Sequence, residues 1–178
     1  MIWRLDAALA RLQHWDELVC VRFNRRTQQR PVLLALQAIS WLGNGIFWYA
    51  LMLALLLADQ AGAALPVLHM VFVGAVCTCS YKMVKHATVR RRPYQVNPLV
   101  SAGAAVLDRF SFPSGHTLHA IAFSIVACFY YPGLWVMLVP FTLVTAVSRV
   151  ALGLHYPSDV LAGAALGALI AAGSFAVA

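Results

Sequence analysis

Charged residues are scarce in this chain, and acidic residues are the scarcest. Aspartate and glutamate together number six among 178 residues, and all charged side chains make up 11% of the sequence, against 62% for hydrophobic ones. The mean hydropathy is +0.77. A soluble domain of this length cannot bury so much apolar surface. The composition therefore excludes an ordinary soluble domain and indicates a membrane protein.

Cysteines are also few, and their spacing fits neither a metal site nor a disulfide framework. Cys77, Cys79 and Cys128 lie in apolar runs and Cys20 lies in the N-terminal segment, so we expect them to be small packing residues. The net charge is +7. No basic stripe alternates with aromatic residues, which argues against nucleic acid as a partner. A membrane surface and an anionic lipid substrate explain the positive charge.

The N-terminal segment has helical periodicity without a continuous apolar stretch. Its apolar residues recur at Ile2, Leu5, Leu9, Leu12, Trp15 and Val19. The charged residues between them would each cost about 2.5–3.5 kcal/mol at the centre of a membrane. The pattern predicts an amphipathic helix at the membrane interface rather than a spanning helix or a cleavable signal peptide.

Five apolar runs follow, over residues 32–58, 63–84, 114–131, 134–152 and 158–178. Each approaches the roughly 20 residues that cross the hydrocarbon layer. Gly43-Asn44-Gly45 is expected to break the first run only mildly, and Gly163 and Gly167 form a small-xxx-small pattern suited to close helix packing. The sequence predicts an all-α integral membrane bundle of about five transmembrane helices plus the amphipathic helix. We expect one domain over 1–178, with an N-terminal segment at 1–30 and a catalytic helical core at 31–178.

Three short motifs lie at the ends of these runs. They are Lys85 with Arg92-Pro93, then Pro113-Ser114-Gly115-His116, then Ser148-Arg149 with His155 and Asp159. Because successive spans cross the membrane in alternate directions, the ends that carry these motifs fall at the same face. The topology therefore predicts that the three motifs converge on one site.

The residue types in these motifs suit phosphoryl transfer, whose reacting group is anionic throughout. Lys85, Arg92 and Arg149 are expected to hold the phosphate oxygens, with Ser148 as a weaker hydrogen-bond donor. Backbone N–H groups of Ser114 and Gly115, at a predicted helix start, can add an anion site, although an ordinary helix start explains them too. Arg90 and Arg91 are expected to touch lipid headgroups or solvent.

His155 is the expected nucleophile. Asp159, four residues later, can accept a proton from one ring nitrogen and leave the other free to attack phosphorus. The alternative is that both residues merely cap a helix. His116, at the start of a predicted helix, is placed to exchange protons with the leaving group and water. His116 and His119 form an H-x2-H pair, but no carboxylate accompanies it, so no metal site is expected.

The order and spacing of the motifs resemble the pattern K-x6-R-P, P-S-G-H, S-R-x5-H-x3-D of the type-2 phosphatidic acid phosphatases, whose fold is shared by vanadium haloperoxidases. All three motifs match without substitution. The resemblance implies a small bacterial-type lipid phosphatase that works through a phosphohistidine intermediate, needs neither metal ion nor cofactor, and uses His116 as the general acid and base. The family is built on six helices, so the N-terminal segment is expected to replace the first.

The substrate class expected is a phosphorylated membrane lipid, and several lipids remain open. Small bacterial-type members of the family often recycle undecaprenyl diphosphate, which slightly favours that lipid over phosphatidate and phosphatidylglycerophosphate. Two other functions are weighed against phosphatase activity: a haloperoxidase with bound vanadate, and a membrane protein that binds lipid phosphate without cleaving it. Five spans disfavour the first, and the complete set of His155, His116 and Asp159 disfavours the second. The oligomeric state stays open.

The membrane expected is a bacterial-type inner membrane, but the side of the active site stays open. If the N-terminal helix lies at the face of the site, all thirteen lysine and arginine residues lie there, ten of them outside the motifs. The positive-inside rule then favours the cytoplasmic face. The resemblance favours the outer face instead, because bacterial relatives that recycle the undecaprenyl carrier usually face outward.

Overall fold

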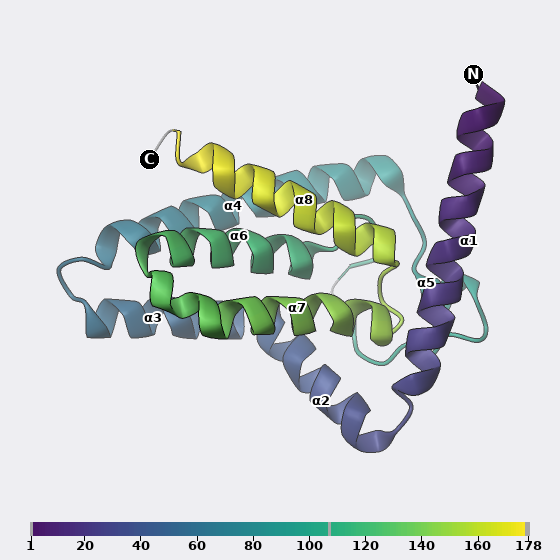
Figure 1. Cartoon of the computed structure of the whole chain (residues 1–178), viewed down its shortest axis with the longest axis horizontal. Helices are drawn as coiled ribbons and strands as arrows, with labels where there is room; N and C mark the ends of the chain where they lie inside the picture. Colours follow the sequence, from purple (N-terminus) through teal and green to yellow (C-terminus); the bar gives the residue numbers. More distant parts are fainter. Residues whose placement is uncertain (1, 107, 177–178) are drawn as a thin grey trace.

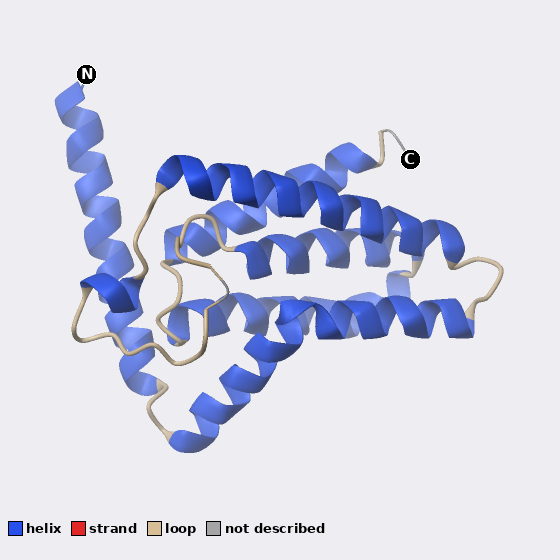
Figure 2. Cartoon of the chain, turned by 180° about the vertical axis from the view of Figure 1, so that it is seen from behind, coloured by secondary structure: helices blue, strands red, loops and turns tan. Residues whose placement is uncertain are grey.

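A computed structural model describes residues 2–106 and 108–176 of the chain. Within those ranges the secondary structure is entirely helical (Figure 2). The predicted fold class, an all-α membrane bundle with an N-terminal helix outside it, is confirmed.

Five helices run side by side to form the bundle (Figures 1 and 2). They are α3 (Phe47–Ala58), α4 (Ala64–Thr88), α6 (Gly115–Tyr130), α7 (Trp135–Ala151) and α8 (Pro157–Ser174). Helix α6 contacts α4, α7 and α8, and its Leu118, Ala120 and Val126 are fully buried. The 3₁₀ turn η2 (Pro132–Leu134) joins α6 to α7. The centre of the bundle is therefore α6, with the other helices around it.

Glycines in α8 permit its close approach to α6. A Cβ atom added at Gly163 would lie 2.5 Å from the carbonyl oxygen of Ser114, and one at Gly167 would lie 2.3 Å from that of Leu118. Both distances are far below van der Waals contact, so no larger residue fits without moving backbone. The close helix packing predicted from the small-xxx-small pattern is confirmed.

Among the described residues, four helical segments are long and apolar enough to span a membrane: Arg30–Ala58, Ala64–Val96, Pro132–Ala151 and Pro157–Ser174. The fifth predicted span, α6, has only 16 residues. At 1.5 Å per residue it is about 24 Å long, shorter than a hydrocarbon layer of about 30 Å. Its central position explains this, because much of α6 is covered by protein rather than by lipid.

The first span bends more strongly than the sequence suggested. Helix α2 (Arg30–Trp41) continues into a π-helical turn, η1 (Leu42–Ile46), where Gly45 has φ 119°. Non-glycine residues rarely adopt that conformation. Figure 1 shows α2 running obliquely away from α3 beyond this turn. The expected mild break is in fact a sharp bend, and it places Asn44 beside the candidate site.

Helix α1 (Ile2–Arg26) runs across one end of the bundle rather than along it (Figure 1). Leu9, Leu12 and Leu18 are exposed on its outer side, whereas Asp16 and Cys20 are fully buried against the bundle. Asn24 and Thr27 continue this buried polar side and both donate hydrogen bonds to the carbonyl oxygen of Ala151. The outer side of α1 also carries exposed charged residues, Arg11 and Arg22 among them, and such a mixed surface is expected for a helix at the membrane interface.

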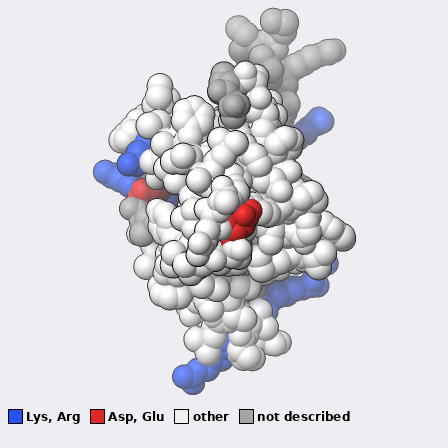
Figure 3. All heavy atoms as spheres, turned by 90° about the vertical axis from the view of Figure 1, so that its left-hand side faces the viewer, with Lys and Arg blue, Asp and Glu red and all other residues white. Residues whose placement is uncertain are grey.

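The two ends of the bundle differ in charge. The end farthest from α1, which carries the α3–α4 turn and the α6–α7 connection, faces the viewer in Figure 3 and is largely uncharged around an acidic patch at its centre. No lysine or arginine occurs from residue 31 to 81 or from 110 to 148. The basic residues thus gather at the end that α1 crosses.

Candidate active site

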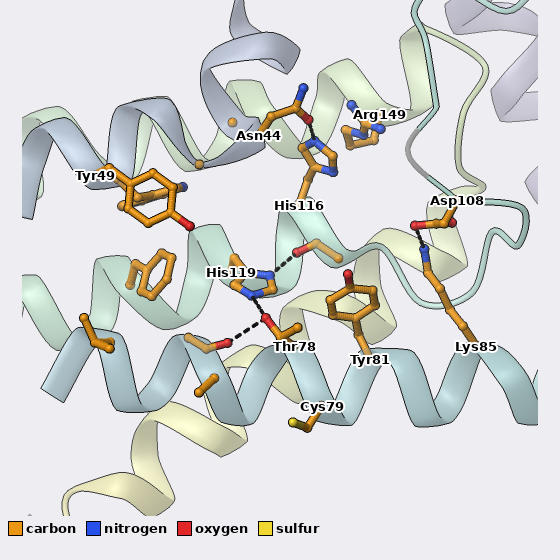
Figure 4. A pocket seen from close by; sticks show the side chains of 18 of the residues that line it. Asn44, Tyr49, Thr78, Cys79, Tyr81, Lys85, Asp108, His116, His119 and Arg149 are labelled. Atoms are coloured by element: carbon orange, nitrogen blue, oxygen red, sulfur yellow. Dashed lines mark hydrogen bonds and ion pairs between the residues drawn. The ribbon is translucent and has the colours of Figure 1, made fainter. Parts of the chain in front are cut away.

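A cavity of about 540 Å³ opens between α3, α4 and α6 (Figure 4). Its wall is polar at the end near α1, where it is lined by Lys85, Arg92, Asp108, His116, Arg149 and His155. Its other part is largely apolar, with Trp48, Met52, Val71 and Phe123. The structure thus brings residues of all three sequence motifs to the polar end of one cavity, whose apolar part suits a hydrocarbon chain.

Three cations form the polar end. Lys85, Arg92 and Arg149 expose 5%, 2% and 3% of their surface. Asp108, on the loop between α5 (Pro93–Val96) and α6, lies 2.6 Å from Lys85 Nζ and 2.8 Å from Arg92 Nη2. One carboxylate against three cations leaves two positive charges in excess. Since a buried charge is costly without a partner, an anion entering this cluster would be stabilised.

Asp108 was not singled out from the sequence, yet it is the counter-charge of the cluster. Burial alone would raise the pKa of its carboxyl group, but hydrogen bonds and charge from Lys85 and Arg92 lower that pKa below the ordinary value. Asp108 is therefore ionised at neutral pH. It bonds to Lys85 and Arg92, two of the side chains that the sequence assigned to phosphate oxygens.

Arg149 approaches from the C-terminal end of α7. Its Nη1 donates a hydrogen bond to the hydroxyl of Ser40 in α2, and its buried Nε has no hydrogen-bond partner within the described residues. Burying a guanidinium N–H without a partner is unfavourable. Arg149 therefore retains an N–H that can bind an anion, the role that the sequence predicted for it. The sequence could not predict its contact with Ser40, because that contact depends on the bend of the first span.

His155 lies in the turn between α7 and α8 and is 2% exposed. Its Nε2 lies 3.2 Å from Arg92 Nη1, a donor without lone pairs, so Nε2 is the unprotonated nitrogen. Burial, and then the charges of Arg149, Arg92 and Lys85, lower the pKa of His155 well below 6.5. The imidazole is thus neutral at neutral pH, with its lone pair on the nitrogen that faces the cations.

Asp159 faces the other nitrogen of His155. Its Oδ2 lies 3.6 Å from His155 Nδ1, which is longer than a hydrogen bond, and accepts a hydrogen bond of 2.8 Å from the N–H of Tyr156. Helix α8 begins at Pro157, with Asp159 in its first turn. Both sequence hypotheses therefore describe part of the geometry: Asp159 caps the helix, and the same carboxylate lies beside His155.

His116 lies in the first turn of α6, and Figure 4 shows it pointing toward Asn44. Its Nε2 is hydrogen-bonded to Asn44 Oδ1, which orients the ring. The two glycines around Asn44 could have indicated an unusual backbone there, but not its partner. The neighbouring Gly115 also lines the cavity.

The two serines of the motifs do not line the cavity. Ser114 N–H donates to the carbonyl oxygen of Asp159, and its hydroxyl is bonded to that of Thr117. The hydroxyl of Ser148 donates to the carbonyl oxygen of Thr145. The Ser114 N–H and the Ser148 hydroxyl, two groups that the sequence assigned to an anion, thus both donate to backbone carbonyl oxygens in this structure.

Arg90 also lies elsewhere than expected. Rather than reaching lipid headgroups, its guanidinium pairs with Asp16 of α1 and with Asp159. Two carboxylates more than a hundred residues apart in the chain meet at this side chain, which no local pattern could indicate.

The sequence matches the model of the PAP2 superfamily over residues 63–178. A curated relative, decaprenylphosphoryl-5-phosphoribose phosphatase of Mycobacterium tuberculosis, is 35% identical over 114 residues, which are 63% of this chain and 56% of the relative. Lipid A 1-phosphatase of Rhizobium johnstonii is 41% identical over 58 residues, 33% of this chain and 24% of that protein. The chain thus aligns with about half the length, or less, of these curated relatives.

Two solved structures share the fold. The PAP2-type phosphatidylglycerolphosphate phosphatase of Bacillus subtilis superposes with a TM-score of 0.75 at 23% identity, covering 99% of this chain and 92% of that one. Aquifex aeolicus LpxE superposes with a TM-score of 0.70 at 19% identity, covering 88% and 92% of the two chains. The architecture seen here is therefore that of known membrane PAP2 proteins.

Proposed function

The chain belongs to the PAP2 superfamily, and from that premise we propose that it is an integral-membrane lipid phosphatase. The observation that carries the proposal is the state of His155: a buried, neutral imidazole whose unprotonated Nε2 faces Lys85, Arg92 and Arg149. A nucleophile next to an excess of positive charge is what attack on an anionic phosphate requires.

In the first step, the lone pair of His155 Nε2 forms a bond to phosphorus while the bond from phosphorus to the lipid oxygen breaks. His116 enters this step protonated on both ring nitrogens and gives one proton to the departing oxygen, which leaves it neutral. The proton on Nδ1 of His155 stays with the ring and faces Asp159, which stabilises the positive charge of the phosphorylated imidazole. Lys85, Arg92 and Arg149 neutralise the charge on the phosphate oxygens.

In the second step, water attacks the phosphohistidine and His116 takes a proton from it. The new P–O bond forms as the N–P bond breaks, and the electron pair returns to Nε2. Inorganic phosphate leaves, and the enzyme regains its initial protonation state. Phosphate that binds Lys85 and Arg92 competes with Asp108 for these two side chains, whereas Arg149 Nε has no protein partner among the described residues.

The substrate proposed is a lipid phosphate or diphosphate whose tail lies in the apolar part of the cavity, beside Trp48 and Phe123. Relatives with phosphatase activity on a polyprenyl-linked sugar phosphate and on lipid A support the class. Undecaprenyl diphosphate is the first lipid to test, and phosphatidate and phosphatidylglycerophosphate are the alternatives. A bacterial-type inner membrane is the proposed location.

Phosphate release by the purified protein in detergent with EDTA tests this proposal, with the three lipids in parallel. His155→Ala is the decisive variant, and His86→Ala, an exposed histidine beside Lys85, is the matched control. We expect release that survives EDTA, persists in His86→Ala and is lost in His155→Ala. Equal release by His155→Ala, or none from the wild type on any lipid, would favour a protein that binds lipid phosphate without cleaving it.

A further inference from the structure

Arg90 lies between two buried carboxylates that come from opposite ends of the chain. Its Nη2 is 2.7 Å from Asp16 Oδ2 in α1, and its Nη1 is 2.6 Å from Asp159 Oδ1 in α8. The side chains of both aspartates are 0% exposed. The guanidinium fork is suited to binding two separate oxygens at fixed geometry, which a lysine ammonium does less precisely.

Arg90 limits how Asp159 can turn. One oxygen of the Asp159 carboxylate accepts from Arg90, and the other accepts from the N–H of Tyr156 at 2.8 Å. Because each oxygen has its own donor, rotation about the carboxylate bond would break a charge-assisted hydrogen bond. The oxygen bonded to Tyr156 is the one that lies 3.6 Å from His155 Nδ1. Arg90 and the N–H of Tyr156 therefore together restrain the orientation of Asp159 toward His155.

Arg90 is held in its turn by α1. Asp16 accepts hydrogen bonds from Arg90 and from both the N–H and the hydroxyl of Ser158. The guanidinium also stacks on the ring of Tyr156, with Arg90 Cζ 4.2 Å from the centroid. Asp16 thus joins Ser158, at the start of α8, to Arg90, which follows α4. Asp16 itself lies in α1, outside the residues matched by the family model, 63–178.

We propose that Arg90, held by Asp16, is a positioning residue that fixes Asp159 beside His155. Arg90, Asp16 and Asp159 form a cluster, the carboxylate cluster, that carries one net negative charge. The proposal rests on the proposed function, because it assigns Asp159 to the support of a nucleophilic His155. Two carboxylates and one guanidinium give a net charge of −1. That charge faces the imidazole, which becomes positive when Nε2 bonds to phosphorus.

The net charge of the carboxylate cluster predicts that substitutions of Arg90 and of Asp16 shift the pKa of His155 in opposite directions. Arg90→Met leaves a charge of −2, so we expect protonated His155 to be favoured and its pKa to rise. Asp16→Asn leaves a charge of 0, so we expect that pKa to fall. The double variant returns the charge to −1. The other groups that act on His155 are unchanged in all variants. They are Arg149 of α7, Lys85 of α4, Arg92 at the start of α5, Asp108 of the loop, His116 of α6 and Cys20 of α1, whose thiol donates to the His155 carbonyl.

The test is the pH profile of kcat/KM for phosphate release by wild type, Arg90→Met, Asp16→Asn and the double variant, with Arg91→Met as the control at an exposed neighbour. We expect the acidic limb to move up by about one pH unit in Arg90→Met, down in Asp16→Asn, and back toward wild type in the double variant. We expect kcat of Arg90→Met to fall by about 10²-fold with KM little changed.

Other outcomes would overturn the proposal. A rise in KM at constant kcat and an unmoved limb would mean that Arg90 binds the substrate headgroup. Loss of activity with the limb unmoved in every variant would mean a structural role alone. An NMR titration of isotope-labelled His155 measures the same shifts without substrate. If the wild type releases no phosphate, the proposed function fails, and the titration still decides whether Arg90 and Asp16 set the protonation of His155.

Discussion

The carboxylate of Asp108 lies 2.8 Å from Arg92 Nη2 and, through its other oxygen, 2.6 Å from Lys85 Nζ. It occupies the donors proposed for the phosphate of the substrate. A buried cation cluster needs a counter-anion in the absence of substrate, and Asp108 supplies it from a loop rather than from one of the bundle helices.

Asp108→Asn is expected to strengthen phosphate binding, because the competing negative charge is removed while the side chain keeps its shape. Inorganic phosphate should inhibit the variant at roughly tenfold lower concentration, about 1.4 kcal/mol of binding free energy. Competitive inhibition by phosphate, measured for wild type and variant, checks this. Arg109→Gln, a change of charge at the next residue, is the control. Weaker inhibition in Asp108→Asn would show that Asp108 helps to hold the phosphate site together.

The acidic limb of kcat/KM is expected to lie below pH 6.5 in the wild type. Burial and three cations lower the pKa of His155, so the imidazole stays neutral until the pH falls well below its ordinary value, and activity should be lost only there. Lys85→Met removes one of those cations and should move the limb to higher pH. The same lipid is used for both proteins, so ionisation of the substrate cancels in the comparison. A limb at the same pH in both would contradict the electrostatic account.

Gly167→Ala is expected to destabilise the bundle, because the added Cβ would lie 2.3 Å from the backbone oxygen of Leu118. Overpacking of this kind costs about 1–3 kcal/mol. The thermal unfolding midpoint in detergent should fall. Gly173→Ala, in the same helix but with no atom within 4 Å of the added Cβ, is the matched control and should unfold near the wild-type temperature. Equal midpoints for the two variants would mean that α8 can shift away from α6.

Cysteine labelling decides between the two membrane sides that stay open for the active site, of which the positive-inside rule favours the cytoplasmic one. The α3–α4 turn would then lie outside, so a cysteine at Ala61 should react with a membrane-impermeant maleimide in intact cells. A cysteine at Arg26, beside the site end, should react only after lysis. The background variant lacks Cys79 and Cys128, since Cys20 and Cys77 are fully buried. The reverse labelling pattern would place the site outward, as recycling of an undecaprenyl carrier requires.

The sequence could predict the convergence of the motifs because crossing direction alternates and the apolar runs are long. It could also predict that Asp159 lies beside His155, since Pro157 starts a helix that brings the two side chains near each other, although at 3.6 Å they are not hydrogen-bonded. The bend at Gly43–Gly45 was underestimated, because glycine shows where a backbone can turn but not how far. The direction of that turn is what places Asn44 beside His116.

The sequence could not predict which individual side chains from distant segments pair with one another. Asp16 and Asp108 are two of only six acidic residues, which marks them as unusual, but nothing local pairs Asp16 with Arg90 or Asp108 with Lys85 and Arg92. The positions of Ser114 and Ser148 were missed for a related reason. A hydroxyl near a phosphate motif can equally bond within the fold, and only the packed helices show that Ser114 bonds to the hydroxyl of Thr117 and that Ser148 donates to the carbonyl oxygen of Thr145.

The central claim is that His155 forms the bond to phosphorus. The most direct test is rapid quenching of the enzyme with a lipid whose terminal phosphate is radiolabelled, followed by recovery of the labelled peptide. We predict protein-bound label that is stable in base and labile in acid, as a phosphoramidate is, on the peptide containing His155, and none in His155→Ala. Label on a different residue, or label that persists in His155→Ala, would contradict the account.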